Sequence, residues 1–168
     1  MFKISGVVRT LLILTILISS ISCDQLTKSM VRNQVSTDEQ ISLLSNSVTL
    51  MRVENAGAFL SLGNTLPSLV KLAVLILIPV LVLLAGIYFV FYRKDIQSIT
   101  LIGICFVLGG GIGNIYDRII YGSVTDFLHI NFGIFQTGIF NLADVSIMVG
   151  IMIVLFDTYR KKTLSEAA

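Results

Sequence analysis

Four long apolar stretches, each bounded by charged or polar residues, divide the chain. They cover residues 7–23, 69–92, 98–115 and 140–159. A helix crosses the hydrocarbon core of a bilayer with about 20 mainly apolar residues, in a range of roughly 17–25. Each stretch is therefore long enough to span a membrane. The pattern predicts an all-α integral membrane protein with four transmembrane helices.

Two polar segments separate these spans, at residues 24–68 and 116–139. Residues 48–54 (VTLMRVE) are rich in β-branched and apolar side chains and are followed by the turn-forming sequence Asn-Ala-Gly. Residues 124–130 alternate in polarity as a short strand does. We therefore expect the polar segments to be loops that carry a small β-sheet, with a strand, a turn and a second strand resting on the membrane surface.

Composition supports a membrane protein. Of the 168 residues, 55% are hydrophobic and only 13% are charged, whereas soluble domains contain about 25% charged residues. The length leaves room for a single membrane domain over residues 1–168. The net charge of +2 is too small to indicate nucleic-acid binding.

The first span also has features of a cleaved secretory signal. It is short, it follows the basic residue Lys3, and it ends in the small residues Ser22 and Cys23. We expect it to remain as a transmembrane helix, because the rest of the chain is itself a multi-pass membrane protein.

The basic residues indicate an orientation. Four spans place both termini on one side of the membrane, and seven of the twelve basic residues flank the spans on that side. They are Lys3, Arg9, Arg93, Lys94, Arg160, Lys161 and Lys162. The positive-inside rule makes this side cytoplasmic, so both polar segments and their sheet are expected to face outward.

The third span ends in the glycine-rich sequence GGGIG. Gly109 and Gly113 form a small-xxx-small pair, which allows another helix to approach closely. The spacing does not match a phosphate-binding loop, and no strand precedes it. We therefore expect these glycines to serve helix packing.

Residues 109–144 contain several charged and amide side chains between apolar sequences. Among them are Asn114, Asp117, Arg118, Asp126, Asn141 and Asp144. Taken singly, each has an ordinary structural interpretation. The Asn-x-x-Asp spacing at 141–144 is typical of a helix N-terminus, with Asn141 as the N-cap. Asp126 is typical of a loop carboxylate, and adjacent Asp117 and Arg118 are typical of a local ion pair.

Their joint occurrence at one face of the membrane indicates chemistry. Acidic residues near a membrane interior are costly and usually mark function. When two carboxylates lie close, one pKa rises, which leaves a protonated acid beside a charged base. Such a pair can activate water and protonate a departing amide nitrogen. Asp126 and Asp144 are the natural pair, because Arg118 would keep Asp117 ionised.

Other chemistries lack parts or stay open. His129 is the only histidine and no GxSxG sequence accompanies it, which disfavours a serine triad and excludes an HExxH zinc site. Magnesium or manganese held by Asp117, Asp126, Asp144 and His129 remains an alternative. A proton- or ion-coupled transporter and a noncatalytic scaffold remain alternatives of other classes, although the acids cluster at one face and no internal repeat is visible.

Four sequence blocks resemble the prolipoprotein signal peptidases, also called signal peptidase II. They are DQLTK (residues 24–28), ENAGAF (54–59), GGGIGNIYDRIIYGSVTDF (109–127) and FNLADVSI (140–147). Their order and spacing, together with the four apolar spans, extend the resemblance over essentially the whole chain.

The resemblance implies a bacterial inner-membrane aspartic peptidase that needs no cofactor. Its partners would be membrane lipids and a diacylglyceryl-modified prolipoprotein, which it would cut just before the lipidated cysteine. Asp126 and Asp144 correspond to the family's catalytic pair. Asn55, Asn114, Arg118 and Asn141 correspond to its substrate-binding pocket, which also binds globomycin. Asp24, Lys28, Gly57 and Asp117 match further motif positions with structural or positioning roles. The family fold has four transmembrane helices and a small outward-facing sheet.

Overall fold

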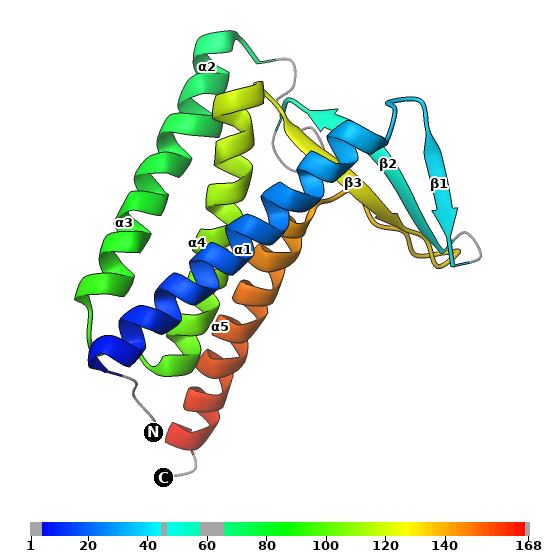
Figure 1. Cartoon of the computed structure of the whole chain (residues 1–168). Coiled ribbons are helices and arrows are strands. Elements are labelled where there is room, and N and C mark those ends of the chain that lie inside the picture. The colour runs from blue at the N-terminus through cyan, green and yellow to red at the C-terminus, as the bar shows by residue number, and fades with distance from the viewer. Residues whose placement is uncertain (1–4, 45–46, 58–65, 167–168) are drawn as a thin grey trace.

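Four helices of spanning length and a small sheet form the chain. The computed structural model describes residues 5–44, 47–57 and 66–166, and all that follows concerns these residues. The helical elements are α1 (Gly6–Gln34), α2 (Ser68–Leu72), the π-helical turn η2 (Ala73–Leu77), α3 (Ile78–Tyr92), α4 (Ser98–Tyr121) and α5 (Leu142–Glu166). α2, η2 and α3 are continuous, so four helices are long and apolar enough to cross a membrane, as predicted. Figure 1 shows both termini at the end of the bundle opposite the sheet.

Three helices extend beyond the predicted spans. α1 continues to Gln34 instead of ending near residue 23, and α4 continues to Tyr121 instead of ending near residue 115. The polar residues taken to mark the ends of these spans are buried between helices: Asp24, Lys28 and Asp117 are 0% exposed. Parts of the polar segments 24–68 and 116–139 are therefore helical, which corrects their assignment as loops.

α5 runs past the predicted end at residue 159. Arg160 and Lys161 do not stop the helix, because both form salt bridges with the buried Asp157 one turn earlier, at 2.9 and 2.6 Å. Spacings of i,i+3 and i,i+4 place these side chains on one helix face.

The sheet has three antiparallel strands in the order β1 (Gln40–Leu43), β2 (Val48–Asn55) and β3 (Val124–Ile130). β2 and β3 match the strands predicted at 48–54 and 124–130. The strand expected after the Asn-Ala-Gly turn falls mainly on residues 58–65, which lie outside the described residues. β2 pairs with the preceding β1 and with the distant β3.

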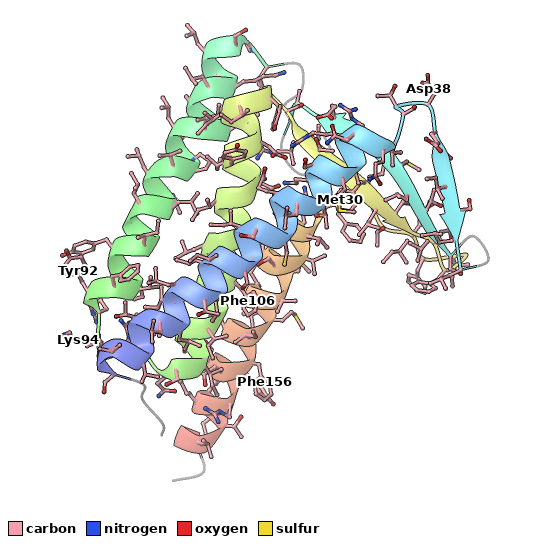
Figure 2. The ribbon with its side chains drawn as sticks, viewed as in Figure 1. Met30, Asp38, Tyr92, Lys94, Phe106 and Phe156 are labelled. Atoms are coloured by element: carbon pink, nitrogen blue, oxygen red, sulfur yellow. The ribbon has the colours of Figure 1, made fainter. Side chains whose placement is uncertain are left out.

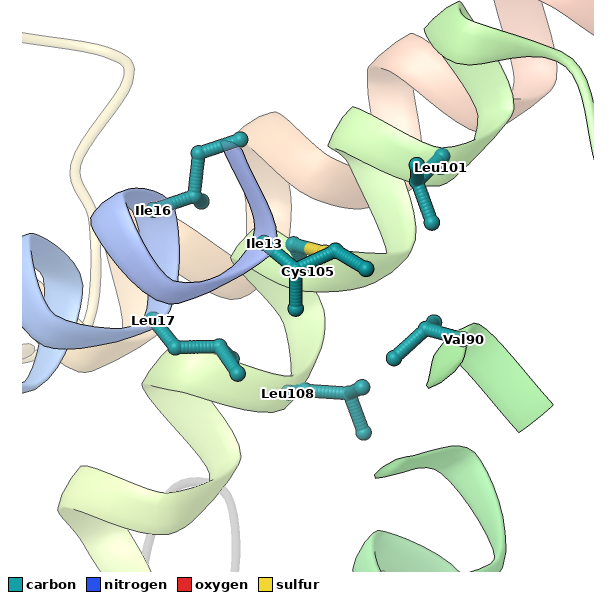
Figure 3. Close-up of a cluster of buried hydrophobic side chains, with 7 residues drawn as sticks. All are labelled: Ile13, Ile16, Leu17, Val90, Leu101, Cys105 and Leu108. Carbon is teal, nitrogen blue, oxygen red and sulfur yellow. The ribbon is translucent and has the colours of Figure 1, made fainter. Parts of the chain in front are cut away.

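α4 is the central helix and its glycines set the helix spacing. A Cβ added at Gly109 would lie 2.6 Å from the Ser20 Cβ of α1, and one at Gly110 would collide with the Ala143 backbone oxygen of α5. The lack of side chains at these positions lets the backbones approach, as the small-xxx-small pattern predicts. The apolar cluster below them comprises Ile13, Ile16, Leu17, Val90, Leu101, Cys105 and Leu108 (Figure 3).

The helical span that contains Pro79 includes a π turn. The N–H of Ile78 donates to the carbonyl of Ala73, five residues earlier. A proline ring clashes with the carbonyl four residues before it in a regular helix, and a wider turn at that point relieves the clash. The span therefore continues through the proline.

Candidate functional site

The polar residues converge where the helix bundle meets the sheet. Asp126 lies on β3, is 5% exposed, and faces the first turn of α5, which carries Asp144. Asn114 comes from α4, Asn141 directly precedes α5, and Asn55 ends β2. The fold thus brings together side chains from four elements that are far apart in the sequence.

Every oxygen of the two carboxylates accepts an N–H group from an asparagine. Asn141 Nδ2 donates to Asp126 Oδ1 at 2.6 Å, and Asn55 Nδ2 donates to Asp126 Oδ2 at 3.1 Å. Asn114 Nδ2 donates to Asp144 Oδ1 at 2.8 Å, and the backbone N–H of Asn141 donates to Asp144 Oδ2 at 3.1 Å. Since N–H donors stabilise the ionised form of a carboxylate, the three asparagines support a buried carboxylate, Asp126, and a half-buried one, Asp144.

The same residues cap α5. Asn141 Oδ1 accepts the N–H of Asp144 at 2.9 Å, while Asp144 Oδ2 accepts the N–H of Asn141. This exchange has the geometry of a capping box. The predicted N-cap is therefore present. The cap uses the side-chain oxygen of Asn141, and the NH2 group of the same side chain donates to Asp126.

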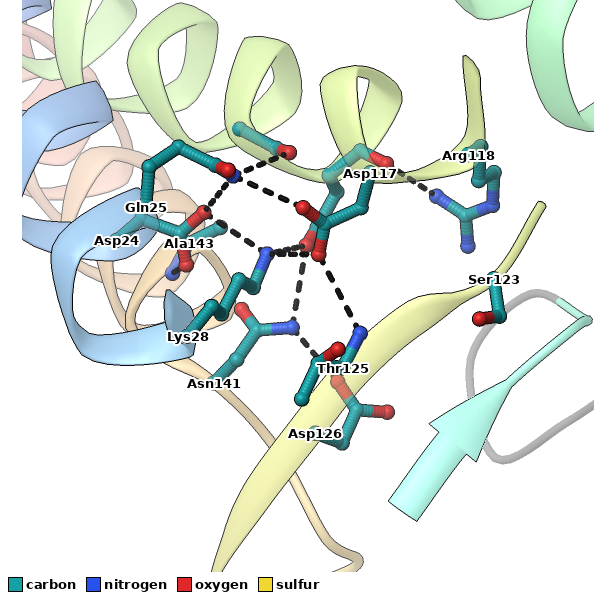
Figure 4. A network of polar contacts seen from close by, with 12 residues as sticks. Asp24, Gln25, Lys28, Asp117, Arg118, Ser123, Thr125, Asp126, Asn141 and Ala143 are labelled. Atoms are coloured by element: carbon teal, nitrogen blue, oxygen red, sulfur yellow. Dashed lines mark hydrogen bonds and ion pairs between the residues drawn. The ribbon is translucent and has the colours of Figure 1, made fainter. Parts of the chain in front are cut away.

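A second cluster supports the first from α1. Lys28 Nζ lies 2.8 Å from Asp24 Oδ2, 3.1 Å from Asp117 Oδ2 and 2.9 Å from Asn114 Oδ1 (Figure 4). Asp24 also accepts the backbone N–H of Ala143 at 2.9 Å. A buried charge is tolerated when it is paired and hydrogen-bonded. These contacts join α1, α4 and the start of α5.

Asp117 does not pair with Arg118. Its partners are Lys28 and Arg32, the latter at 2.9 Å, so the expected local ion pair is wrong. Residues 117 and 118 are successive on a helix and point in different directions. Arg118 Nη2 instead donates to the carbonyl of Gly57 at 2.8 Å, which ties the end of β2 to α4.

Gln25 and Arg32 were missed by sequence reasoning. Gln25 Nε2 lies 3.1 Å from Asp24 Oδ2 and 3.0 Å from Asp117 Oδ1. Arg32 Nε donates to Thr125 Oγ1 at 2.8 Å, beside Asp126. The available signal was helical spacing, since Arg32 follows Lys28 by four residues, but it required knowing that α1 continues beyond residue 23.

Asp126 differs electrostatically from an ordinary aspartate. The pKa of Asp126 is raised from 3.8 to about 6. Burial is the main cause and the neighbouring charge of Asp144 adds to it, whereas hydrogen bonds from Asn55 and Asn141 and the charge of Lys28 act in the opposite direction. The positive charge of Arg118 interacts with both carboxylates. A pair in which one member holds a proton near neutral pH has the asymmetry that acid–base chemistry requires.

A pocket of about 460 Å³ opens beside Asp126. It is lined by Met51, Val53, Asn55, Asp126, His129, Gln136, Thr137, Gly138 and Ile139. Polar and apolar residues both line it, and Asp126 is the carboxylate among them.

The proposed oxygen-rich metal set does not assemble in the part of the chain described. No three His, Cys, Asp or Glu side chains there converge as ligands. Asp117 is occupied by its two cationic partners, and His129 lies opposite Thr49 in the sheet register.

The fold is similar to that of solved bacterial membrane enzymes. One structure, described as a bacterial membrane enzyme determined by the in meso method at 2.3 Å, has a TM-score of 0.79 and 22% sequence identity, and covers 89% of this chain and 88% of its own. A second, at 1.9 Å, has a TM-score of 0.76 and 23% identity over 87% and 91% of the two chains. These similarities concern the fold, which has four helices of spanning length and a small three-stranded sheet.

Sequence comparisons specify the family. The family model for signal peptidase (SPase) II matches residues 16–160. Lipoprotein signal peptidases from Syntrophotalea carbinolica and Clostridium novyi are 32% and 30% identical over 152 and 143 residues. These matches cover 90% and 84% of this chain, and 92% and 93% of the relatives. The chain therefore belongs to the signal peptidase II family of aspartic-type membrane peptidases, which confirms the resemblance found in the sequence and favours a peptidase over a transporter.

Proposed function

We propose that Asp126 and Asp144 activate a water molecule for hydrolysis of a peptide bond in a diacylglyceryl-modified prolipoprotein, just before the lipidated cysteine. The carboxylate that is ionised removes a proton from water, and the one that is protonated donates to the departing nitrogen. Asp126 is proposed as the proton donor, because its pKa is raised to about 6, mainly by burial. The observation that carries this proposal is the asparagine-lined carboxylate pair.

The remaining polar residues receive separate roles. Asn55, Asn114, Arg118 and Asn141 surround the pair and supply N–H donors to the substrate backbone or to the carboxylates. Asp24, Lys28 and Asp117 hold the helices in register behind them, and Gly57 presents its carbonyl to Arg118. Globomycin is proposed to bind among the same residues and to compete with substrate.

The membrane itself supports recognition of a lipidated substrate. Large apolar side chains of the helices are exposed, among them Met30, Tyr92 and Phe156 (Figure 2), and are proposed to contact membrane lipids. A diacylated precursor is confined to the same layer, and its buried methylenes contribute affinity of about 0.8 kcal/mol each. Binding energy from the remote lipid can position the scissile bond for attack.

The orientation proposed from the basic residues agrees with this mechanism. The bundle end that holds both termini also carries Arg93, Lys94 and Arg160, and the site lies at the other end (Figure 1). The positive-inside rule then makes the chain a multi-pass inner-membrane protein with both termini cytoplasmic and the site facing outward.

The test is cleavage of a lipidated precursor peptide by purified protein in detergent or vesicles. Asp126→Asn and Asp144→Asn should each fold, as judged by thermal unfolding, and lose cleavage. Asp38→Asn, an exposed carboxylate change outside the site, is the matched control and should retain it. Substantial turnover in both site variants would reject the carboxylate pair, and equal cleavage of an unlipidated peptide would reject the substrate class.

A further inference from the structure

Two of the three asparagines around the carboxylates have their amide orientation fixed by a backbone donor. Asn55 Oδ1 accepts the backbone N–H of Gly57 at 3.0 Å, and Asn141 Oδ1 accepts the backbone N–H of Asp144 at 2.9 Å. Backbone N–H groups have only a hydrogen to offer, so the amide oxygen must face them. The NH2 group of each of these two asparagines is thereby turned toward Asp126.

Asn114 has no such backbone partner in the described structure. Its Oδ1 accepts hydrogen bonds from Lys28 Nζ at 2.9 Å and from Asn141 Nδ2 at 3.1 Å, and its Nδ2 donates to Asp144 at 2.8 Å. An ammonium group has three donors and no acceptor. If the amide of Asn114 rotated by half a turn, its NH2 group would face the Lys28 ammonium and its oxygen would face the Asp144 carboxylate.

We infer that Lys28 is a positioning residue that acts through Asn114: together with the NH2 group of Asn141, its ammonium fixes the Asn114 amide so that the NH2 group of Asn114 points at Asp144. The inference deepens the proposed peptidase function and rests on it for its catalytic meaning. The Lys28 ammonium contacts Asp24, Asp117 and Asn114, and its contacts to the two aspartates are drawn in Figure 4. Its effect on the pair is therefore transmitted by a directed hydrogen bond as well as by its charge.

The environment of Lys28 favours this role. Lys28 is 0% exposed and is held between Asp24 and Asp117, so its ammonium has little freedom to leave Asn114. Three acceptors lie at 2.8, 3.1 and 2.9 Å from Nζ, one for each of its three donors. Asp24 and Asp117 thus fix the position of the Lys28 ammonium, and the ammonium helps to fix the orientation of the Asn114 amide.

The other end of the bundle offers a matched control. Lys161 forms an i,i+4 salt bridge with the fully buried Asp157, as Lys28 does with Asp24, and each aspartate keeps another donor when its lysine is removed. Lys28→Met removes contacts to two buried aspartates, Asp24 and Asp117, whereas Lys161→Met removes a contact to one, Asp157. Only Lys28→Met also removes a donor to Asn114 Oδ1, which keeps its hydrogen bond from Asn141 in both variants.

The direct test is nuclear magnetic resonance of the Asn114 side-chain amide in detergent, which needs no catalytic activity. In the natural protein we expect cross-relaxation from the Asn114 NH2 protons to the Asp144 Hβ protons and none to Lys28 Hε. In Lys28→Met, contacts to the ε-methyl group of the introduced methionine should appear as both orientations become populated. Strong contacts to Lys28 Hε in the natural protein would overturn the inference, whether or not the protein cleaves peptides.

The second arm is the pH dependence of cleavage. Lys28→Met should lower kcat by roughly 10–100-fold, in the range found for residues that orient catalytic ligands, and move the acidic limb of the profile to higher pH. Lys28→Arg keeps a side chain that has donors and no acceptors, so it should have nearly the kcat and the pH profile of the natural protein. It replaces Lys28→Met in the test if Lys28→Met does not fold. Lys161→Met should change neither. If Lys28→Met folds and its pH profile is unchanged, the inference is contradicted. If the natural protein does not cleave the lipidated peptide at all, only the proposed function is contradicted.

Discussion

Asn141 and Asp144 exchange hydrogen bonds across the first turn of α5 while each also faces the carboxylate site. Asn141 Oδ1 accepts the N–H of Asp144 at 2.9 Å, and Asp144 Oδ2 accepts the N–H of Asn141 at 3.1 Å. The helix cap therefore fixes both the backbone and the side chains of the site. The cap and the proposed chemistry, which were alternative interpretations of the sequence, involve the same residues.

This relationship predicts that stability and activity can be separated at position 141. Asn141→Ser keeps a side-chain oxygen for the cap, so it should be more stable than Asn141→Ala by about 1 kcal/mol, the usual contribution of an N-cap. Both variants should be less stable than the natural protein, because they lose the buried hydrogen bonds that Asn141 donates to Asp126 and Asn114. Both lack the amide that donates to Asp126 at 2.6 Å, so both should lose most cleavage activity. Thermal unfolding and peptide cleavage of the two variants measure this, and a fully active Asn141→Ser would contradict it.

The raised pKa of Asp126 predicts a stability effect that depends on pH. Because the pKa rises from 3.8 in the unfolded chain to about 6 in the folded protein, the folded state binds more protons between these values. Stability from this group is full below pH 4 and is lost as pH rises through 6.

Asp126→Asn, which cannot ionise, should consequently match the natural protein near pH 4 and exceed it above pH 7. The difference should be on the order of 3 kcal/mol at most, from about two pKa units at 1.36 kcal/mol each. Thermal unfolding in detergent across pH 4–8 measures it. Asp38→Asn is the exposed control, and a difference that shrinks as pH rises would have the wrong sign.

Helix packing behind the site predicts different outcomes for two nearby glycines of α4. A Cβ at Gly113 would lie 2.5 Å from Asp24 Oδ2 and would displace the carboxylate that binds Lys28, so Gly113→Ala should destabilise the protein by roughly 1–3 kcal/mol. A Cβ at Gly111 would meet the end of the Leu83 side chain, which can move.

Gly111→Ala is thus the matched control and should cost less than about 1 kcal/mol. Unfolding temperature and cleavage rate distinguish the two. Equal losses in both variants would mean that helix spacing in general, and not the position of Asp24, decides the outcome.

The proposed orientation predicts which engineered cysteines react from outside the cell. Figure 2 places Asp38 beside the sheet and Lys94 at the opposite end of the bundle, and both side chains are exposed. In a Cys23→Ser background, since Cys23 is itself exposed, Asp38→Cys should react with a membrane-impermeant maleimide in cells with a permeable outer layer. Lys94→Cys should react only after the inner membrane is opened, and the reverse pattern would invert the topology.

Elements that depend on residues close together in the chain could be predicted from the sequence. Apolar length decides whether a helix can span a membrane, so the four spans follow from single stretches of sequence. Alternation predicted β3 over residues 124–130, and the Asn-x-x-Asp spacing predicted the cap of α5, because strand faces and helix caps depend on neighbours a few residues apart. Asp126 and Asp144 were chosen from their charge and position near two span ends.

The partners of the charged residues, in contrast, depend on how the chain folds. Asp24 and Lys28 are four residues apart and therefore lie on one helix face, but this spacing does not reveal that Asp117 on α4 completes the cluster. Adjacency in the sequence instead suggested that Asp117 pairs with Arg118. The ends of α1 and α4 were missed for the same reason. A polar residue that is exposed to water often marks the end of a helical span, whereas one that is buried against a distant partner can lie within the helix. Burial and amide orientation depend on groups brought together by folding, and spacing along the chain does not contain that information.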